Sequence, residues 1–118
     1  MGNHSTIKGK VVLVPFPFDD LSTAKVRPAV CLTDPIGPYR HIILAFITSR
    51  IPPDLVDSDL VIDMNHEDFS RTGLRLTSTV RLHRVMTVRI GIIKRKLGTL
   101  SDTQQTEVGG RLRRMFGF

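Results

Sequence analysis

An arginine stands directly before a proline at the start of an apolar run, in the stretch RPAVCL that begins at Arg27. Proline disfavours helical geometry in the residue before it, and having no N–H it suits a strand entrance. A guanidinium stays charged at physiological pH, and its fork of donors matches a phosphate. The pattern therefore indicates Arg27 as a phosphate-binding residue, with a salt bridge to Asp19 or Asp20 as the alternative.

Two hydroxyl side chains, Thr48 and Ser49, close the apolar stretch 42–47. Hydroxyls at the end of a strand can donate to a phosphate oxygen, or they can close a turn by bonding to nearby backbone. Both readings of this pair remain open from the sequence.

The segment 74–85 alternates between apolar and polar residues, which is typical of a strand. Five polar side chains cannot all face a hydrophobic core. They form either a solvated outer face or the floor of a groove that offers cations, hydroxyls and an imidazole suited to proton transfer near neutral pH. The polar positions are Arg75, Thr77, Thr79, Arg81 and His83.

Other kinds of site find little support. The four histidines are scattered and no metal-ligand spacing such as CxxC or HExxH occurs, so we expect neither a metal nor another cofactor. Cys31, the single cysteine, sits in an apolar run and is expected to be a buried thiol. One cysteine allows no internal disulfide and suits a reducing cytoplasm.

The charge of the chain is uneven along its length. The 118 residues, enough for one domain over 1–118, carry a net charge of +6, made of −3 in residues 1–70 and +9 in residues 71–118. A basic half of this kind attracts a polyanion such as nucleic acid, although it can also be a basic surface without a specific partner. The longest apolar stretch, 42–47, is far too short to cross a membrane.

The elements that must position these residues are short. Strands are predicted at 8–16, 27–33, 41–49, 59–64 and 74–85, with a further one or two within 86–98. The nearly continuous apolar character of 41–49 predicts a central strand covered on both faces. Ser101 and Gln104 form a capping-box pattern that opens a C-terminal helix. The sequence therefore predicts a small, curved, mostly antiparallel β-barrel with one terminal helix over an opening or edge.

Four segments, in this order, resemble the PemK/MazF toxin family: KGKVVLVPFPFDDLSTAKVRPAVCL, HIILAFITSR, TGLRLTSTVRLHRVMTV and KRKLGTLSDTQQTEV. They span roughly residues 8–108. The resemblance implies an SH3-like antiparallel β-barrel of the CcdB/Kid/MazF type with a C-terminal helix, usually a homodimer. It also implies the toxin of a type II toxin–antitoxin pair, an endoribonuclease (mRNA interferase) that cuts single-stranded RNA and is neutralised by a protein antitoxin.

The family's functional positions fall on Arg27, on Thr48 with Ser49 beside it, and on Arg81. Some members have an aspartate two residues after the second arginine, where this chain has His83. An imidazole there could still move protons. Further substrate contacts are expected from the polar strand and from the loop 16–25, namely Thr77, Thr79, Lys25, Phe18 and Asp20, although a phenylalanine there is more often a core anchor.

The mechanism expected from these residue types is metal-independent transesterification, in which the RNA 2′-hydroxyl attacks its own phosphate. The products are a 2′,3′-cyclic phosphate and a 5′-hydroxyl. Arg27 would stabilise the phosphorane, Thr48 would orient the phosphate, Arg81 would bind it and His83 would shuttle protons. Two other functions remain open, a gyrase-inhibiting toxin on the same fold and a catalytically silent barrel that binds RNA or protein. The antitoxin is expected to compete with RNA for the basic groove through an acidic segment.

Overall fold

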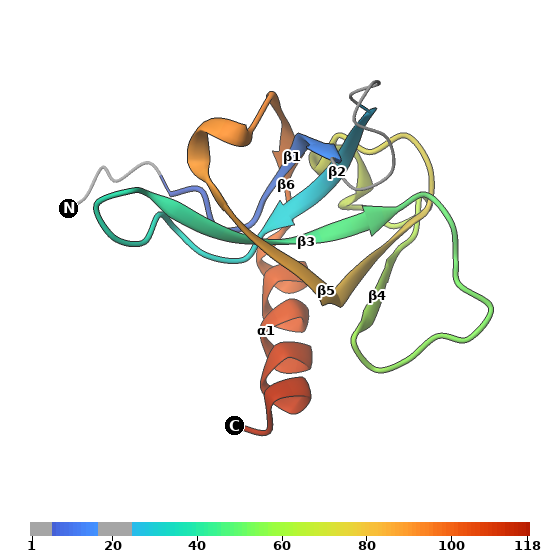
Figure 1. Ribbon diagram of the computed structural model, residues 1–118. Coiled ribbons are helices and arrows are strands. Elements are labelled where there is room, and N and C mark those ends of the chain that lie inside the picture. The colour runs from blue at the N-terminus through green and yellow to red at the C-terminus, as the bar shows by residue number, and fades with distance from the viewer. Residues whose placement is uncertain (1–5, 17–24) are drawn as a thin grey trace.

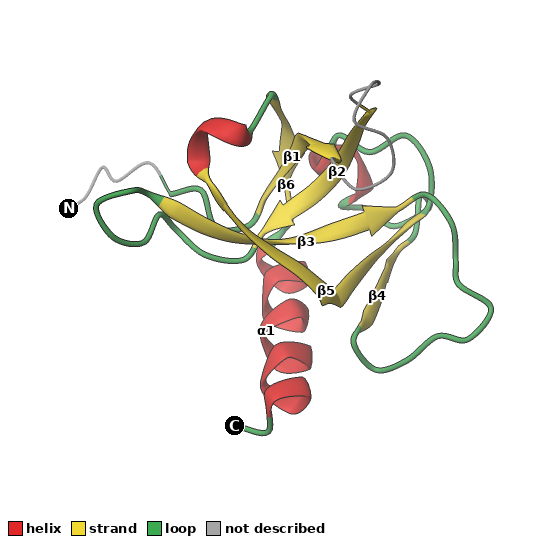
Figure 2. Cartoon of the chain, in the orientation of Figure 1, coloured by secondary structure: helices red, strands yellow, loops and turns green. Residues whose placement is uncertain are grey.

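The computed structural model describes residues 6–16 and 25–118. Within that part of the chain, six strands are followed by one α-helix, with two short 3₁₀ helices between strands (Figure 2). The elements in chain order are β1 Lys10–Phe16, β2 Lys25–Cys31, β3 His41–Thr48, β4 Asp59–Ile62, η1 Phe69–Thr72, β5 Ser78–Arg89, η2 Ile90–Ile92, β6 Arg95–Thr99 and α1 Asp102–Phe116.

All six strands belong to one antiparallel sheet in the order β4-β5-β3-β2-β1-β6. The sheet curls strongly, and α1 extends away from it on one side (Figure 1). The prediction of a mostly β fold with a C-terminal helix is confirmed. The curled sheet forms a half-barrel, because β4 and β6 lie at its two edges.

Strand β3 occupies the middle of the sheet and is covered on both faces, as its apolar sequence predicts. Ile42 and Leu44 belong to one apolar cluster, which includes buried residues of β1 and β2. Ala45 and Ile47 belong to a second cluster, which reaches β4, β5 and the helix. Packing on both faces of β3 therefore fixes the position of its last residue, Thr48.

Strand β5 differs from its prediction at both ends. It begins at Ser78, the partner of the last residue of β4, Ile62, so Arg75 and Thr77 precede the strand. It continues to Arg89, four residues beyond the predicted end, because it pairs with the whole first half of β3. Alternation predicted that a strand lies here. Its first and last residues are set by where β4 and β3 pair with it.

Helix α1 begins at the predicted capping box. The Ser101 hydroxyl accepts a hydrogen bond from the Gln104 amide at 3.1 Å, and the Gln104 side chain accepts one from the Ser101 amide at 2.8 Å. Val108 and Leu112 pack against the core next to Leu100, which anchors the helix to the sheet. In the described residues no helix has the length and apolar character needed to cross a membrane.

Candidate functional site

Strands β2 and β3 separate at one end of the sheet. Their ladder runs from the pair Cys31–Leu44 to the pair Ala29–Phe46 and ends there, while β2 remains paired with β1 as far as Lys25. The next residue of β2, Pro28, has no N–H to donate to a neighbouring strand. The proline therefore stands where the sheet splits, and the space between the two strands opens into a cleft.

This cleft has a volume of about 450 Å³. It combines cationic, hydroxyl and apolar side chains from three strands and the loop after β3. Four of its residues are arginines, which are suited to binding phosphate through paired donors. The lining residues are Arg27, Pro28, Phe46, Ile47, Thr48, Ser49, Arg50, Arg81 and Arg84.

Arg27 lies on β2 opposite Val14, with its side chain exposed on the cleft wall. Its neighbour Pro28 is half-buried, so the extended geometry predicted for this dipeptide is realised inside a strand. Lys25 is exposed at the start of β2 and does not line the cleft. The predicted contacts by Phe18 and Asp20, and the alternative salt bridge from Arg27 to Asp19 or Asp20, lie outside the described residues.

The two hydroxyl residues that end β3 both line the cleft, Thr48 half-buried and Ser49 exposed. Thr48 lies opposite Thr79 in the ladder between β3 and β5. Thr79 is fully buried, and its hydroxyl donates a 2.9 Å hydrogen bond to the carbonyl oxygen of Arg50. Thr79 is therefore not on the cleft surface. It holds the backbone of Arg50, which lines the cleft.

Of the five polar positions predicted to share one face, Arg81 lines the cleft and the other four do not. The Thr77 hydroxyl accepts a hydrogen bond from the Met64 amide at 3.0 Å, which joins it to the turn after β4. His83 is exposed, and its Nδ1 lies 2.7 Å from the Ser58 hydroxyl oxygen. A continuous groove floor was one of the two arrangements that alternation allowed, and these residues make separate contacts instead.

The structure adds Arg84 and Arg50 to the cleft. Between the pairs Ala45–Val85 and Ile47–Val80, the single residue Phe46 of β3 faces four residues of β5, numbers 81–84. This irregularity bends β5 and lets positions three apart reach the same cleft, as bulges do. Strict alternation puts Arg84 on the apolar face, so the pattern does not predict it as a site residue. Arg50, the residue after Ser49, was not among the predicted site residues.

Cys31, the single cysteine of the chain, is not available as a nucleophile at neutral pH. The Cys31 thiol is buried, as predicted, and burial with the nearby Asp34 charge raises its pKa to about 11. It therefore stays protonated at neutral pH and is a poor nucleophile. In the part of the chain that the structure describes, no three His, Cys, Asp or Glu side chains gather closely enough to hold a metal ion.

Comparison with known proteins gives the family. The family model for the PemK-like, MazF-like toxins of type II toxin–antitoxin systems matches residues 7–116. The chain belongs to this family. The resemblance drawn from the four sequence segments is thereby confirmed. No relative is found among the curated proteins.

Several solved structures share the fold of this family member at low sequence identity. Mycobacterium tuberculosis toxin MazF-mt6 superposes with a TM-score of 0.70 and 18% identity, over 92% of this chain and 97% of that one. A mycobacterial endoribonuclease, solved in complex with its cognate antitoxin, gives a TM-score of 0.68 and 13% identity over 97% of both chains. A further Mtb toxin gives a TM-score of 0.65 and 17% identity, over 89% of this chain and 98% of that one.

Proposed function

We propose that this family member is an endoribonuclease toxin that cuts single-stranded RNA in the cleft between β2, β3 and β5. The observation that carries the proposal is the composition of the cleft, which places four arginines around the hydroxyls of Thr48 and Ser49. An RNA phosphate needs cationic donors on its oxygens, and this is the donor set that the cleft provides.

The reaction is an internal transesterification. The 2′-oxygen of the RNA attacks the adjacent phosphorus, the bond to the 5′-oxygen of the next nucleotide breaks, and a 2′,3′-cyclic phosphate and a 5′-hydroxyl result. One proton leaves the 2′-oxygen and one is delivered to the 5′-oxygen, so the protein must stabilise a doubly charged phosphorane and move protons. No metal ion takes part in the proposed scheme.

Arg27 is the residue proposed to stabilise the phosphorane. It projects from a strand held on one side by β1 and lies on the cleft wall opposite the end of β3. A preorganised donor to a developing oxyanion is worth about 3–4 kcal/mol of transition-state stabilisation. Arginine keeps its proton at physiological pH, so we assign it charge stabilisation and not proton abstraction.

The other roles follow from position and residue type. Thr48 donates its hydroxyl to a phosphate oxygen, and Ser49 binds the same group from the next position. Arg81 and Arg84 bind phosphate from the opposite wall, on β5. His83 lies between these two arginines in sequence and is exposed, so its Nε2 is the group proposed to carry the proton.

The proposed partners are a protein antitoxin and a second copy of the chain, acting in the cytoplasm where mRNA is found. The antitoxin is supported by the family and by the related endoribonuclease that was solved with its cognate antitoxin. An acidic segment of the antitoxin would neutralise the arginines of the cleft and exclude RNA.

A short acidic protein encoded beside this gene is the expected antitoxin. Sedimentation of the purified chain tests the homodimer.

The experiment that tests the function is digestion of a single-stranded RNA by the purified chain in EDTA, with chemical analysis of the product ends. We expect cleavage that leaves 2′,3′-cyclic phosphates and 5′-hydroxyls. Loss of cleavage in EDTA would contradict the metal-independent scheme. RNA binding without any product would favour the silent barrel, and inhibition of gyrase without RNA cleavage would favour the gyrase-inhibiting toxin.

A further inference from the structure

The guanidinium of Arg81 is held by a carboxylate that the cleft does not expose. Asp59 on β4 lies directly opposite Arg81 on β5 in the antiparallel ladder. Its Oδ1 accepts a hydrogen bond from Arg81 Nε at 2.9 Å, and its Oδ2 accepts one from Nη2 at 3.3 Å. The Arg81 side chain is 27% exposed, whereas that of Asp59 is 0% exposed.

A carboxylate without exposed surface cannot touch a substrate, so any effect of Asp59 on a reaction in the cleft must pass through Arg81. Two of the five N–H groups of the guanidinium point to Asp59, which leaves three for a ligand. Because the fork is planar, binding one edge of it also fixes the direction of the rest. Without Asp59, the side chain would have to be ordered by the substrate.

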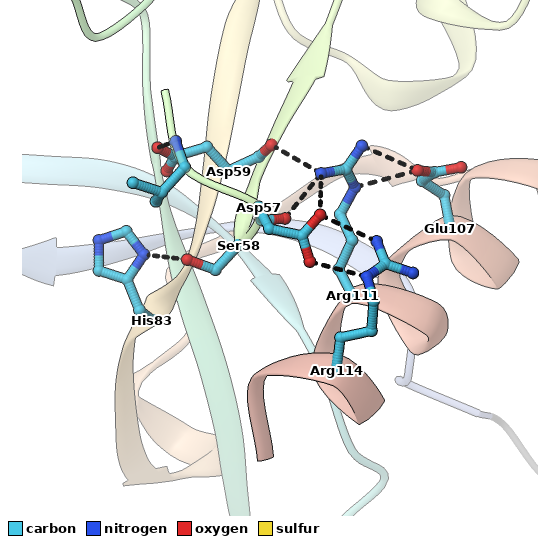
Figure 3. Close-up of polar contacts among 8 residues, drawn as sticks. Asp57, Ser58, Asp59, His83, Glu107, Arg111 and Arg114 are labelled. Atoms are coloured by element: carbon cyan, nitrogen blue, oxygen red, sulfur yellow. Dashed lines mark hydrogen bonds and ion pairs between the residues drawn. The ribbon is translucent and has the colours of Figure 1, made fainter. Parts of the chain in front are cut away.

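The position of Asp59 is itself fixed by the C-terminal helix (Figure 3). Arg111 of α1 donates through Nη1 to the carbonyl oxygens of Asp57 and Asp59, at 2.6 and 3.3 Å. Arg114, one turn further along, binds the Asp57 carboxylate at 2.8 and 3.1 Å. Two arginines of the helix thus clamp the chain immediately before β4.

The same short segment also reaches His83. Ser58, between the two aspartates, places its hydroxyl 2.7 Å from Nδ1 of His83, as Figure 3 shows. Segment 57–59 therefore contacts two proposed site residues on β5, one through a carboxylate and one through a hydroxyl.

We propose that Asp59 is a positioning residue, which orients the Arg81 guanidinium toward an RNA phosphate and is held in register by Arg111 of the C-terminal helix. The inference rests on the proposed function, because it assigns Asp59 a part in RNA cleavage. The competing explanation is an ion pair that stabilises the β4–β5 ladder and has no effect on the reaction beyond keeping the protein folded.

A double-mutant cycle on the purified full chain separates the two explanations. The variants are Asp59→Asn, Arg81→Ala and the double variant, each assayed for RNA cleavage below its melting temperature. In Asp59→Asn, an amide NH₂ replaces one of the two acceptor oxygens, so the Arg81 guanidinium loses one of its two hydrogen bonds. We expect kcat to fall about 10- to 100-fold with a smaller change in KM, as expected for misplacement of a catalytic group.

In the Arg81→Ala background, Asp59→Asn should have no further effect on kcat. An equal loss in both backgrounds, or an unchanged kcat in the single variant, would overturn the positioning role while leaving the proposed function intact. If the wild type cleaves no RNA, the proposed function fails and the positioning role of Asp59 fails with it.

Two further measurements apply if Asp59→Asn does not fold. Arg111→Gln loosens segment 57–59 from the helix and should lower kcat, whereas the exposed Arg113→Gln on the same helix should not. In wild-type protein, the Nε–H signal of Arg81 in NMR spectra should exchange with solvent more slowly than that of Arg113. Equal exchange, or an unchanged kcat in Arg111→Gln, would contradict the proposal.

Discussion

Arg81 and Arg84 line the same cleft although they are three positions apart on one strand. In a regular strand, residues at that spacing face opposite sides of the sheet. Here Phe46 of β3 faces residues 81–84 of β5, and with this irregularity both arginines line the cleft that also includes Thr48 and Ser49. The local irregularity of β5 therefore doubles the positive charge on that wall of the cleft.

Arg84→Gln should weaken RNA binding in a way that depends on salt. Each phosphate contact to a single strand contributes about −0.7 to the slope of log K against log salt concentration. Loss of the Arg84 contact should therefore make the slope less negative by about 0.7. A 2′-O-methyl RNA, which cannot be cleaved by transesterification, serves as the ligand. Arg113→Gln, on the exposed face of α1, is the matched control, and equal slopes for the two variants would remove Arg84 from the interface.

His83→Asn should change the pH–rate profile of RNA cleavage. If the imidazole carries a proton in the reaction, the wild-type profile contains an ionisation that is absent from the variant. His66→Asn, at an exposed histidine that does not line the cleft, provides the control. A profile that is the same in wild type and His83→Asn would show that another group moves the proton.

Asp57→Asn should lower stability at neutral pH and have less effect in acid. The hydrogen bond from Arg114 lowers the pKa of the Asp57 carboxyl below its usual range, with the charges of Arg114 and Arg111 acting in the same direction. The folded state then holds the proton less tightly than the unfolded state, whose aspartates titrate near pH 3.9. The contribution is therefore present above about pH 4 and is lost as the pH falls through the folded pKa.

Urea unfolding of wild type and Asp57→Asn at several pH values measures this difference. It should be small, because the pair is exposed to solvent. Asp54→Asn, at an exposed aspartate in the same loop, is the control. A difference in the free energy of unfolding that does not change between pH 7 and pH 3 would contradict the role given to the carboxylate charge.

Local sequence patterns predicted much of the fold. Apolar runs marked the strands, and Ser101 with Gln104 marked the start of the helix because a capping box depends only on residues three apart. The arginine–proline pair at Arg27 and the hydroxyls after residue 47 were also local signals, and the structure brings both to one cleft.

The remaining features depend on pairing between distant segments. Thr79 looked like a groove residue, but its hydroxyl donates a hydrogen bond to the carbonyl oxygen of Arg50, which follows the end of β3. Asp59 looked like the first residue of a short strand, and its pairing with Arg81 depends on the register of β4 against β5. Neither the register nor the bend that exposes Arg84 can be read from alternation alone.

The central claim is that the arginine cleft cuts RNA, and Arg27→Ala tests it most directly. Cleavage rates of wild type, Arg27→Ala and Arg113→Ala are measured on one RNA under single-turnover conditions in EDTA. Loss of a preorganised donor to the phosphorane should slow Arg27→Ala by about 10²- to 10³-fold, and Arg113→Ala should match the wild type. Equal rates for all three proteins would contradict the assignment of the cleft as the active site.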